Sequence, residues 1–207
     1  MPERHTTRVE KPLTARTLTR ITDPRDAATV IEMSTVRVRS GSPRDIVGVA
    51  GIHLATRRAT YPGMLPDEVL DAMTPASVAA WWRAYLPKAP RPNTLLVADA
   101  GGDPQGFVFL QAAGQEGEIF AIHVHPRAQG QGIGRLLMRR ALETLGSWGC
   151  DRAVLWVLAD NHGAQQFYRN SGWAPVPEGA RVENIDGASV TEVSYALPLA
   201  AAGGCPA

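Results

Sequence analysis

The most informative segment of the chain runs from Glu118 to Arg135 and has the sequence EIFAIHVHPRAQGQGIGR. Its apolar first part predicts a buried strand, its alternating glycines a tight turn, and the residues after Gly134 a helix. Backbone N–H groups at such a turn converge beside the positive end of the helix dipole, which makes an anion site suited to a pyrophosphate. The lysine and hydroxyl of a triphosphate loop are absent, and the glycine spacing differs from that of dinucleotide-binding folds. The alternative is a glycine-rich turn without a ligand.

Two motifs in this region resemble those of one enzyme superfamily. Gln129-x-x-Gly132-x-Gly134 matches a Q/R-x-x-G-x-G/A motif, and residues 161–173, NHGAQQFYRNSGW, match an N-x-x-A-x-x-F/L-Y-x-x-x-G-F/W block. Both are typical of the GNAT superfamily of acyl-CoA-dependent N-acetyltransferases, which the chain resembles most from about 94 to 175. The resemblance implies an enzyme that moves an acetyl group from acetyl-CoA to a primary amine by direct attack in a ternary complex.

The resemblance also implies the fold. This is an α/β fold of the α+β type, whose mixed central sheet of about six to seven strands splays at the cofactor strand and is flanked by about four helices. Hydrophobic periodicity is compatible with this fold. Helices are expected after Ser42, Thr74, the glycine turn and Asn161, and strands near 36–39, 94–98, 106–110, 118–124, 153–158 and 190–197. In the helix after Thr74, we expect Trp81 and Trp82 to lie in the core.

By the same resemblance, the cofactor would bind along the strand and the turn. The pyrophosphate would lie on backbone amides from Gly130 to Arg135, and the pantetheine arm would pair with the main chain at the end of the strand. The implied cofactor-binding residues are Ile122, His123, Val124, Gln129, Gly130, Gln131, Gly132, Ile133, Gly134, Arg135 and Asn161. Asn161 is also expected to cap the helix that follows it.

Two residues are candidates for acid–base catalysis. Tyr168 lies seven residues after Asn161, where the family places a general acid that protonates the departing thiolate. The alternative for Tyr168 is a core aromatic. Glu118 lies eleven residues before Gln129, where several members carry the base that deprotonates the amine, and its alternative is a solvated glutamate. Some ribosomal-protein acetyltransferases place a glutamate where this chain has Trp156, so that specific activity is disfavoured.

The acceptor site is implied at the loop from Tyr61 and at residues 176–192, with Trp82 as a pocket wall. The second segment carries four carboxylates, including Glu183, against one basic residue, Arg181. Excess carboxylate attracts cations, so a cationic amine is expected, unless these charges only solvate a loop. Two alternatives stay open: a non-catalytic acyl-CoA-binding regulatory module, and an acetyltransferase that acts on a protein N-terminus or lysine.

Composition sets the remaining limits. The chain has 207 residues, 44% hydrophobic and 20% charged, with a formal net charge of +1 and two cysteines. These values exclude a disordered chain or a disulfide framework and give no reason for nucleic-acid or membrane binding. His123 and His125 form an H-x-H pair without a third ligand nearby, so no metal is expected. We expect a cytoplasmic protein whose partners are acetyl-CoA and a small-molecule or peptide amine, and a homodimer is left open.

The sequence indicates one domain. Residues 1–32 lack periodicity and are expected to form a poorly ordered extension, residues 33–199 the acetyltransferase domain, and residues 200–207 a flexible tail. Two other interpretations of the extension stay open: a basic arm for a partner, or translation that begins at Met33.

Overall fold

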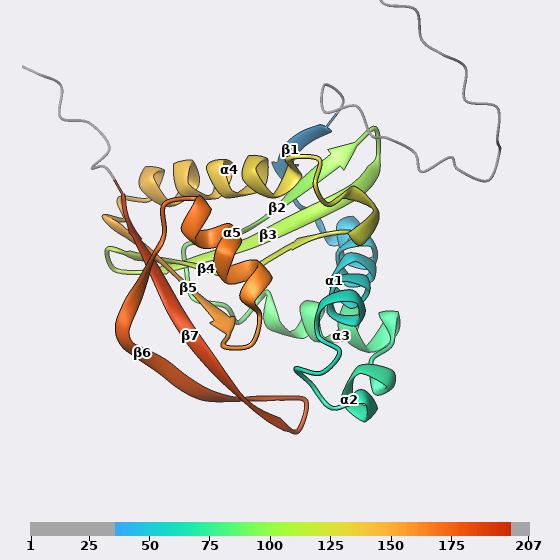
Figure 1. The fold of residues 1–207 in the computed structure, drawn as a ribbon. Coiled ribbons are helices and arrows are strands. Elements are labelled where there is room, and N and C mark those ends of the chain that lie inside the picture. The colour runs from blue at the N-terminus through green and yellow to red at the C-terminus, as the bar shows by residue number, and fades with distance from the viewer. Residues whose placement is uncertain (1–35, 200–207) are drawn as a thin grey trace, which may run out of the picture.

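The computed structural model describes residues 36–199, so the expectations for 1–32, for Met33 and for 200–207 lie outside the described residues (Figure 1). The elements are, in chain order, β1 (Val36–Ser40), α1 (Ile46–Thr60), α2 (Asp67–Ala72), α3 (Pro75–Tyr85), β2 (Asn93–Ala100), β3 (Asp103–Ala113), β4 (Glu116–Val124), α4 (Ile133–Ser147), β5 (Arg152–Leu158), α5 (His162–Asn170), β6 (Ala174–Ile185) and β7 (Ala188–Pro198). This arrangement confirms the expected mixed α+β fold.

The seven strands form one sheet in the order β1-β2-β3-β4-β5-β7-β6. Every neighbouring pair is antiparallel except β4 and β5, which run parallel. The β4–β5 register ends at Ile119 opposite Leu155, while β5 continues to pair with β7 as far as Leu158. Residues 120–124 of β4 therefore pair only with β3, and the sheet splays here as expected.

A β-bulge lies at the point where the sheet splays. Phe109 of β3 pairs with Ala121, but Leu110 pairs with Ile119, so Phe120 is the extra residue on β4. A bulge bends its strand and redirects the side chains beyond it. It therefore turns the end of β4 away from β5.

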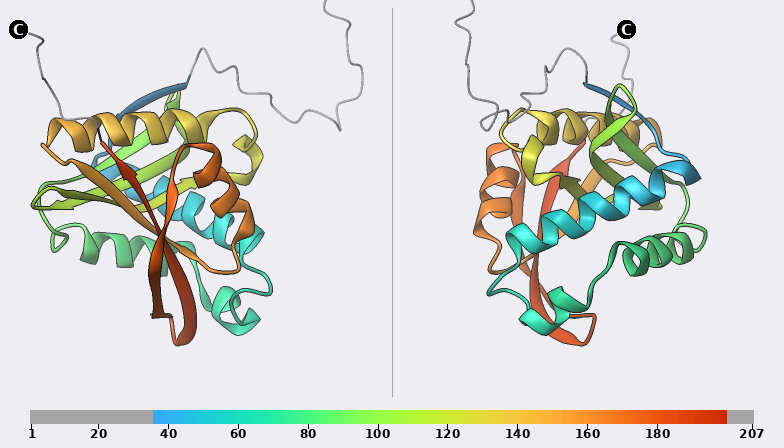
Figure 2. Two further views of the ribbon diagram at one scale, coloured as in Figure 1. Left: turned by 60° about the vertical axis from the view of Figure 1, so that its left-hand side comes forward. Right: turned by 90° about the vertical axis from the view of Figure 1, so that its right-hand side faces the viewer.

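The helices cover the two faces of the sheet separately (Figure 2). Helix α4 packs its face of Leu137, Ala141 and Leu145, all fully buried, on one side, where side chains of α5 join the same core. Helices α1 and α3 pack on the other side, around Val49 and Trp82. The i, i+4, i+8 spacing of the α4 residues explains why this amphipathic helix forms.

Trp81 differs from the sequence expectation. Trp82 is fully buried, whereas Trp81 is 43% exposed. Consecutive residues of a helix point about 100° apart, so two neighbouring tryptophans cannot both face one core. Val78 and Trp82, four residues apart, take the core positions.

The sequence predicts no strand between Gly172 and Val190, yet most of the segment 176–192 belongs to a hairpin. β6 pairs with β7 at Ala174 and Pro175 and again from Ala180 to Ile185, and none of its residues is buried. Its prolines and charged residues conceal the strand pattern. Asp186 and Gly187 at the turn both have positive φ, 50° and 94°. Asp-Gly is the residue pair that a two-residue hairpin turn favours, so this dipeptide was the available sequence signal.

Candidate active site

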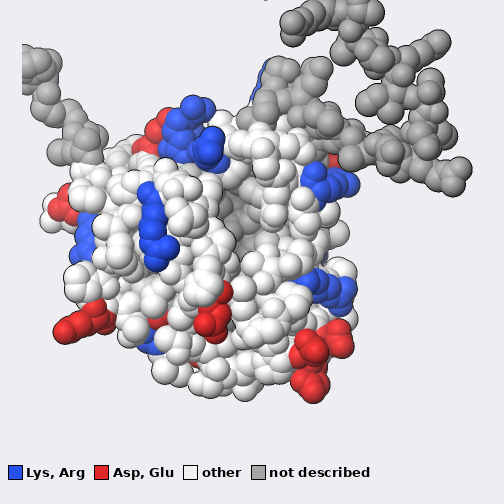
Figure 3. Space-filling model, viewed as in Figure 1, with Lys and Arg blue, Asp and Glu red and all other residues white. Residues whose placement is uncertain are grey.

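A cavity of about 1190 Å³ opens where β4 and β5 separate. Its walls come from α1, α3, the two splayed strands, the start of α4, α5 and the β6–β7 hairpin. The space-filling view shows this face of the molecule hollowed between α5 and the α1 side (Figure 3). The splayed sheet therefore places a site between segments far apart in sequence.

The glycine turn forms one end of the cavity. Gly130 and Gly132 have φ of 75° and 83°, and Gly132 is the N-cap of α4. Only glycine adopts this left-handed conformation without strain, and a Cβ added at Gly130 would meet nothing within 4 Å. Together with Gly134 and Arg135, this open turn lines the cavity at the positive end of α4. Its geometry fits an anionic group.

Gln131 and Ile133 lie differently from their neighbours in the turn. Ile133 is buried in the core, and Gln131 Nε2 donates to the Arg127 carbonyl at 3.1 Å. Neither side chain lines the cavity. Both residues are predicted to bind the cofactor, but only their backbone amides, and not their side chains, are available to a ligand.

The end of β4 has an open edge, because β5 no longer pairs with it beyond Ile119. His125 N–H donates to the Gln105 carbonyl at 2.8 Å, so His125 faces β3, and by antiparallel alternation His123 does too. Ile122 and Val124 therefore direct their N–H and C=O groups toward the side that β5 has left. This refines the sequence expectation, because His123 contributes its side chain, not its main chain, to the cavity.

The carbonyl of Val124 is already engaged. It accepts hydrogen bonds from Gln129 Nε2 at 3.1 Å and from Thr56 Oγ1 at 3.3 Å. The Gln129 side chain thus joins the loop to the end of the strand. The remaining groups at this edge are the N–H of Val124 and both main-chain groups of Ile122.

Helix α5 begins at the opposite wall. Asn161 Oδ1 accepts a hydrogen bond from Ala164 N at 3.1 Å, which confirms the predicted cap. Gln165 Nε2 donates to the Ala159 carbonyl at 2.7 Å, and its Oε1 accepts from Tyr195 Oη at 3.2 Å. These bonds fix α5 against the ends of β5 and β7, so the residues that it directs into the cavity are held rigidly.

Tyr168 is one of those residues. It lines the cavity and is 7% exposed, and no hydrogen bond engages its hydroxyl among the described residues. Burial, and then the nearby Tyr61, raise the pKa of Tyr168 above its usual value. Tyr61 reaches the same space from the end of α1, and burial likewise raises its pKa. Both phenols are therefore protonated at neutral pH.

Glu118 lies on the other side of the bulge and ends a chain of hydrogen bonds. Tyr85 Oη donates to Gln111 Oε1 at 3.1 Å, and Gln111 Nε2 donates to Glu118 Oε2 at 2.6 Å. An ionised carboxylate only accepts, so Gln111 must present its amide nitrogen and Tyr85 must donate to its oxygen. No cation pairs with Glu118 within residues 36–199.

A buried imidazole pair lies between α1 and the sheet. Trp82 Nε1 donates to His53 Nδ1 at 3.0 Å, and the His53 ring stacks on His123 with 4.6 Å between centroids. Burial, His123 and Arg57 lower the pKa of His53 well below its usual value. Burial and Arg57 lower the pKa of His123 to about 3. Both rings are therefore neutral at physiological pH.

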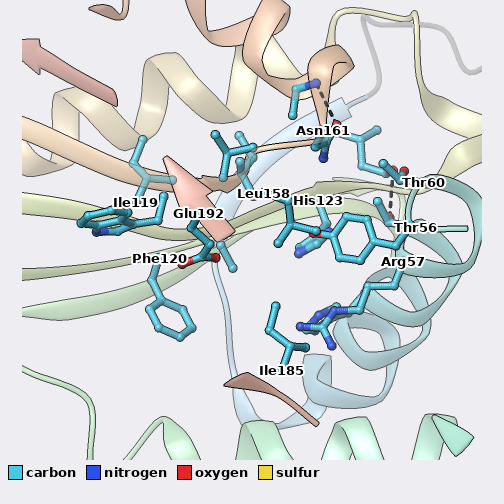
Figure 4. A pocket seen from close by; sticks show the side chains of 18 of the residues that line it. Thr56, Arg57, Thr60, Ile119, Phe120, His123, Leu158, Asn161, Ile185 and Glu192 are labelled. Atoms are coloured by element: carbon cyan, nitrogen blue, oxygen red, sulfur yellow. Dashed lines mark hydrogen bonds between the residues drawn. The ribbon is translucent and has the colours of Figure 1, made fainter. Parts of the chain in front are cut away.

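The hairpin closes the far end of the cavity with two ion pairs. Arg57 Nη1 lies 3.4 Å from Asp186 Oδ2 at the hairpin tip. Arg181 Nη2 lies 2.8 Å from Glu192 Oε2, and the Arg181 guanidinium lies 4.1 Å from the centre of the Trp156 ring. Figure 4 shows Arg57 near Ile185, and Glu192 on the side of Phe120.

These pairs change the charge balance inferred from the sequence. The charged residues that line the cavity are Glu118, Glu183, Asp186, Glu192, Arg57, Arg135 and Arg181. Asp186 and Glu192 are compensated by arginines, and Glu183 lies at the rim 3.8 Å from Arg181. Glu118 is left as the carboxylate inside the cavity without a cationic partner in the described part of the chain.

The structure brings most of the sequence candidates together. Apart from Gln131 and Ile133, every predicted site residue lines this one cavity. Sequence reasoning missed Arg57 and Gln111. Arg57 lies one helical turn after His53 on the inner face of α1, and Gln111 is a buried polar residue in an apolar strand. Both patterns were available in the sequence.

The described residues contain no group of three or more His, Cys, Asp or Glu side chains that could hold a metal ion. Between residues 36 and 199, no helix is long and apolar enough to cross a membrane.

The sequence matches both a model of a protein family and individual proteins of known sequence. The sequence model of the Acetyltransferase (GNAT) family matches residues 52–173. Mycothiol acetyltransferase of Beutenbergia cavernae is 47% identical over 60 residues, which are 29% of this chain and 20% of that protein, so the match spans about a fifth of that relative. An uncharacterized N-acetyltransferase of Bacillus subtilis is 26% identical over 170 residues, covering 79% of this chain and 93% of its own.

A solved structure shares the fold. The PaiA N-acetyltransferase from Thermoplasma acidophilum, in complex with coenzyme A, has a TM-score of 0.58 at 18% identity. The likeness covers 79% of this chain and 98% of that protein.

Proposed function

The chain belongs to the Acetyltransferase (GNAT) family, and we propose that it moves an acetyl group from acetyl-CoA to the primary amine of a small molecule. One observation carries this proposal. A single cavity contains the open edge of β4, the glycine turn, the Tyr168 hydroxyl and the Glu118 carboxylate. An amine that enters between the last two would meet a thioester laid along the strand.

The residues present fit acetyl-CoA. Backbone amides at the start of α4 are unsatisfied by the helix itself and would receive the pyrophosphate. The free main-chain groups of Ile122 and Val124 would pair with the amides of the pantetheine arm, as a strand edge pairs with a peptide. Asn161, whose Oδ1 is used in the cap, would offer its Nδ2 to the same arm.

The proposed chemistry uses two protein groups. Glu118 accepts the proton of the incoming ammonium, directly or through water, so that the neutral amine attacks the thioester carbonyl. Tyr168 donates its phenolic proton to the departing thiolate. Its raised pKa keeps that proton available at neutral and moderately alkaline pH. The reaction needs Glu118 as the proton acceptor and Tyr168 in its protonated form, which the raised pKa of Tyr168 provides.

The closed end of the cavity supports a small-molecule acceptor over a protein. Side chains of the hairpin pack against Leu65, just before α2, and Leu70 within it; the hairpin residues are Ile185, Ala188 and Val190. The tip of the hairpin lies beside α2 (Figure 2), and residues of both the hairpin and α1 line the cavity, which leaves less room for an extended peptide.

Initial rates test direct transfer. With acetyl-CoA and the amine both varied, a ternary complex predicts intersecting double-reciprocal lines, and the mass of the enzyme with acetyl-CoA alone should stay unchanged. Parallel lines with an acetylated enzyme would contradict direct attack. Binding of acetyl-CoA without turnover on any amine would favour the regulatory module, and better turnover of peptides than of small amines would favour a protein acceptor.

A further inference from the structure

Trp81 is a large, exposed apolar side chain that lines the cavity. Of the large exposed hydrophobic side chains among residues 36–199, Val47, Trp81 and Val182, only Trp81 lines the cavity. A single exposed apolar side chain is ordinary on a protein surface. An indole that is left open inside a concave site is a candidate contact for a ligand.

Trp81 belongs to a group of near-parallel rings. Its ring is tilted by 7° from that of Tyr85 at 5.0 Å between centroids and by 14° from that of Phe120 at 6.3 Å. Tyr85 and Phe120 are stacked at 4.7 Å and 20°. We call Trp81 and Phe120, which line the cavity, the aromatic wall, with Tyr85 behind it.

The aromatic wall is held rigidly. Tyr85 meets Phe109 of the core edge-on at 5.9 Å and 76°, and its hydroxyl is bonded to Gln111. Phe120 likewise packs edge-on against Phe109, at 6.0 Å between centroids and 85°. A flat, pre-formed apolar surface binds a flat ligand with little loss of conformational entropy.

The carboxylate without a cationic partner lies beside this wall. Glu118 precedes Phe120 by two residues, and both line the cavity. Gln111 bonds to Glu118 and to Tyr85, so one chain of contacts joins the carboxylate to the aromatic wall. An ammonium group satisfies Glu118 and is also attracted to aromatic faces. A substrate carboxylate at the same position would meet repulsion from Glu118.

From this juxtaposition we infer that the acceptor is a primary amine carried on a flat, uncharged aromatic body, with the ring against Trp81 and Phe120 and the nitrogen at Glu118. The inference rests on the proposed function. In the reaction, the nitrogen lone pair forms the C–N bond and the thioester C–S bond breaks. The ammonium first passes one proton to Glu118. After attack, the thiolate takes the Tyr168 proton, and the second proton lost by the nitrogen returns to the Tyr168 phenolate, directly or through water. N-acetyl amine, free CoA and the one proton released from Glu118 are the net products.

A panel of amines tests this substrate class. We expect kcat/KM for 2-phenylethylamine and tryptamine to exceed that for hexylamine by at least about tenfold, because only the aryl amines stack on the wall. Phenylalanine, which adds a carboxylate to 2-phenylethylamine, should be poorer by at least about tenfold. Similar values for aryl and alkyl amines would overturn the inference.

Variants of Trp81 add a matched test. Trp81→Ala should lower kcat/KM for 2-phenylethylamine by at least about tenfold, mainly through KM, and leave hexylamine and acetyl-CoA nearly unchanged. Trp81→Phe should retain most of the wild-type value, and Val47→Ala, an exposed position outside the cavity, all of it. An equal loss for every amine would assign Trp81 a structural role only.

Calorimetry separates this inference from the proposed function. If no amine is acetylated although acetyl-CoA binds, the proposed function fails. The binding of 2-phenylethylamine to the CoA-bound protein then decides the substrate class by itself. Binding that Trp81→Ala weakens supports the inference, and absence of binding overturns it.

Discussion

At the scale of single residues, the neighbouring Tyr168 and Tyr195 differ in whether their hydroxyls are hydrogen-bonded. Tyr195 is bonded to Gln165 and lies outside the cavity, whereas the Tyr168 hydroxyl faces the cavity without a partner in the described residues. Tyr168→Phe removes one oxygen and the proton that the thiolate needs, so turnover should fall by about 100-fold or more with acetyl-CoA affinity nearly kept. Tyr195→Phe, the matched control, should retain most of its turnover. Full activity of Tyr168→Phe between pH 6 and 9 would remove its assignment as the acid.

Gln111 is the residue that positions Glu118. Gln111→Leu keeps the volume of the side chain but frees the carboxylate from its 2.6 Å hydrogen bond. We expect kcat to fall by about tenfold, because a misplaced base loses its alignment with the amine. The control is Gln105→Leu, a buried amide of the same strand that does not line the cavity. Steady-state kinetics of the two variants that show equal losses would refute a positioning role.

At the scale of elements, the start of α4 is the expected phosphate site. Gly134 lines the cavity, and a Cβ there meets Phe167 at an ordinary 3.5 Å, so Gly134→Glu should fold. Its carboxylate would occupy the place of the pyrophosphate and repel it, lowering acetyl-CoA affinity roughly tenfold or more by calorimetry. Gly146→Glu, near the other end of the same helix, should bind normally. Unchanged affinity in Gly134→Glu would mean that the cofactor lies elsewhere.

Elements marked by a hydrophobic repeat or a capping residue were predictable from the sequence, and elements that lack both marks were not. Buried faces such as that of α4 repeat every three to four residues, and the Asn161 cap is a local pattern, so both followed from spacing. β6 has almost no buried residue, so period-two alternation does not mark it. Helix α2 has only six residues, too few to show a period.

The candidate site was predictable as a set of residues but not as an arrangement. The motifs located the turn, Asn161 and Tyr168, because their spacing is local. The ion pair of Arg57 with Asp186, 129 residues apart, and the aromatic wall depend on tertiary packing. Arg57 compensates the charge of Asp186, and a count of the carboxylates in residues 176–192 could not show this.

At the scale of the whole molecule, the stacked histidines connect stability to pH. Burial holds the pKa of His123 at about 3 and that of His53 well below normal, whereas an unfolded histidine titrates near 6.5. Below pH 6.5 only the unfolded chain takes up these protons. The free energy of unfolding should therefore fall as the pH drops from about 6.5 toward 3, by at most about 1.4 kcal/mol per pH unit for each histidine, and be unaffected above 6.5.

Urea unfolding at pH 7.5, 6 and 5 measures this dependence. His123→Phe, which keeps a ring to stack on His53 and Phe107, should flatten the slope. His162→Gln, at the exposed start of α5, should leave the slope unchanged. A slope that is identical in His123→Phe and in the wild type would show that the stacked pair is not its source.

The central claim concerns the whole molecule acting as an acetyl transferase, and one measurement tests it most directly. The protein is incubated with acetyl-CoA labelled in its acetyl group and with 2-phenylethylamine, tryptamine, hexylamine and phenylalanine in separate reactions, and labelled N-acetyl amine and free CoA are quantified by mass spectrometry. The account predicts equal amounts of the two products, formed at a rate that depends on both substrates. Release of CoA without acetylated amine, or bound acetyl-CoA with no product from any amine, would contradict it.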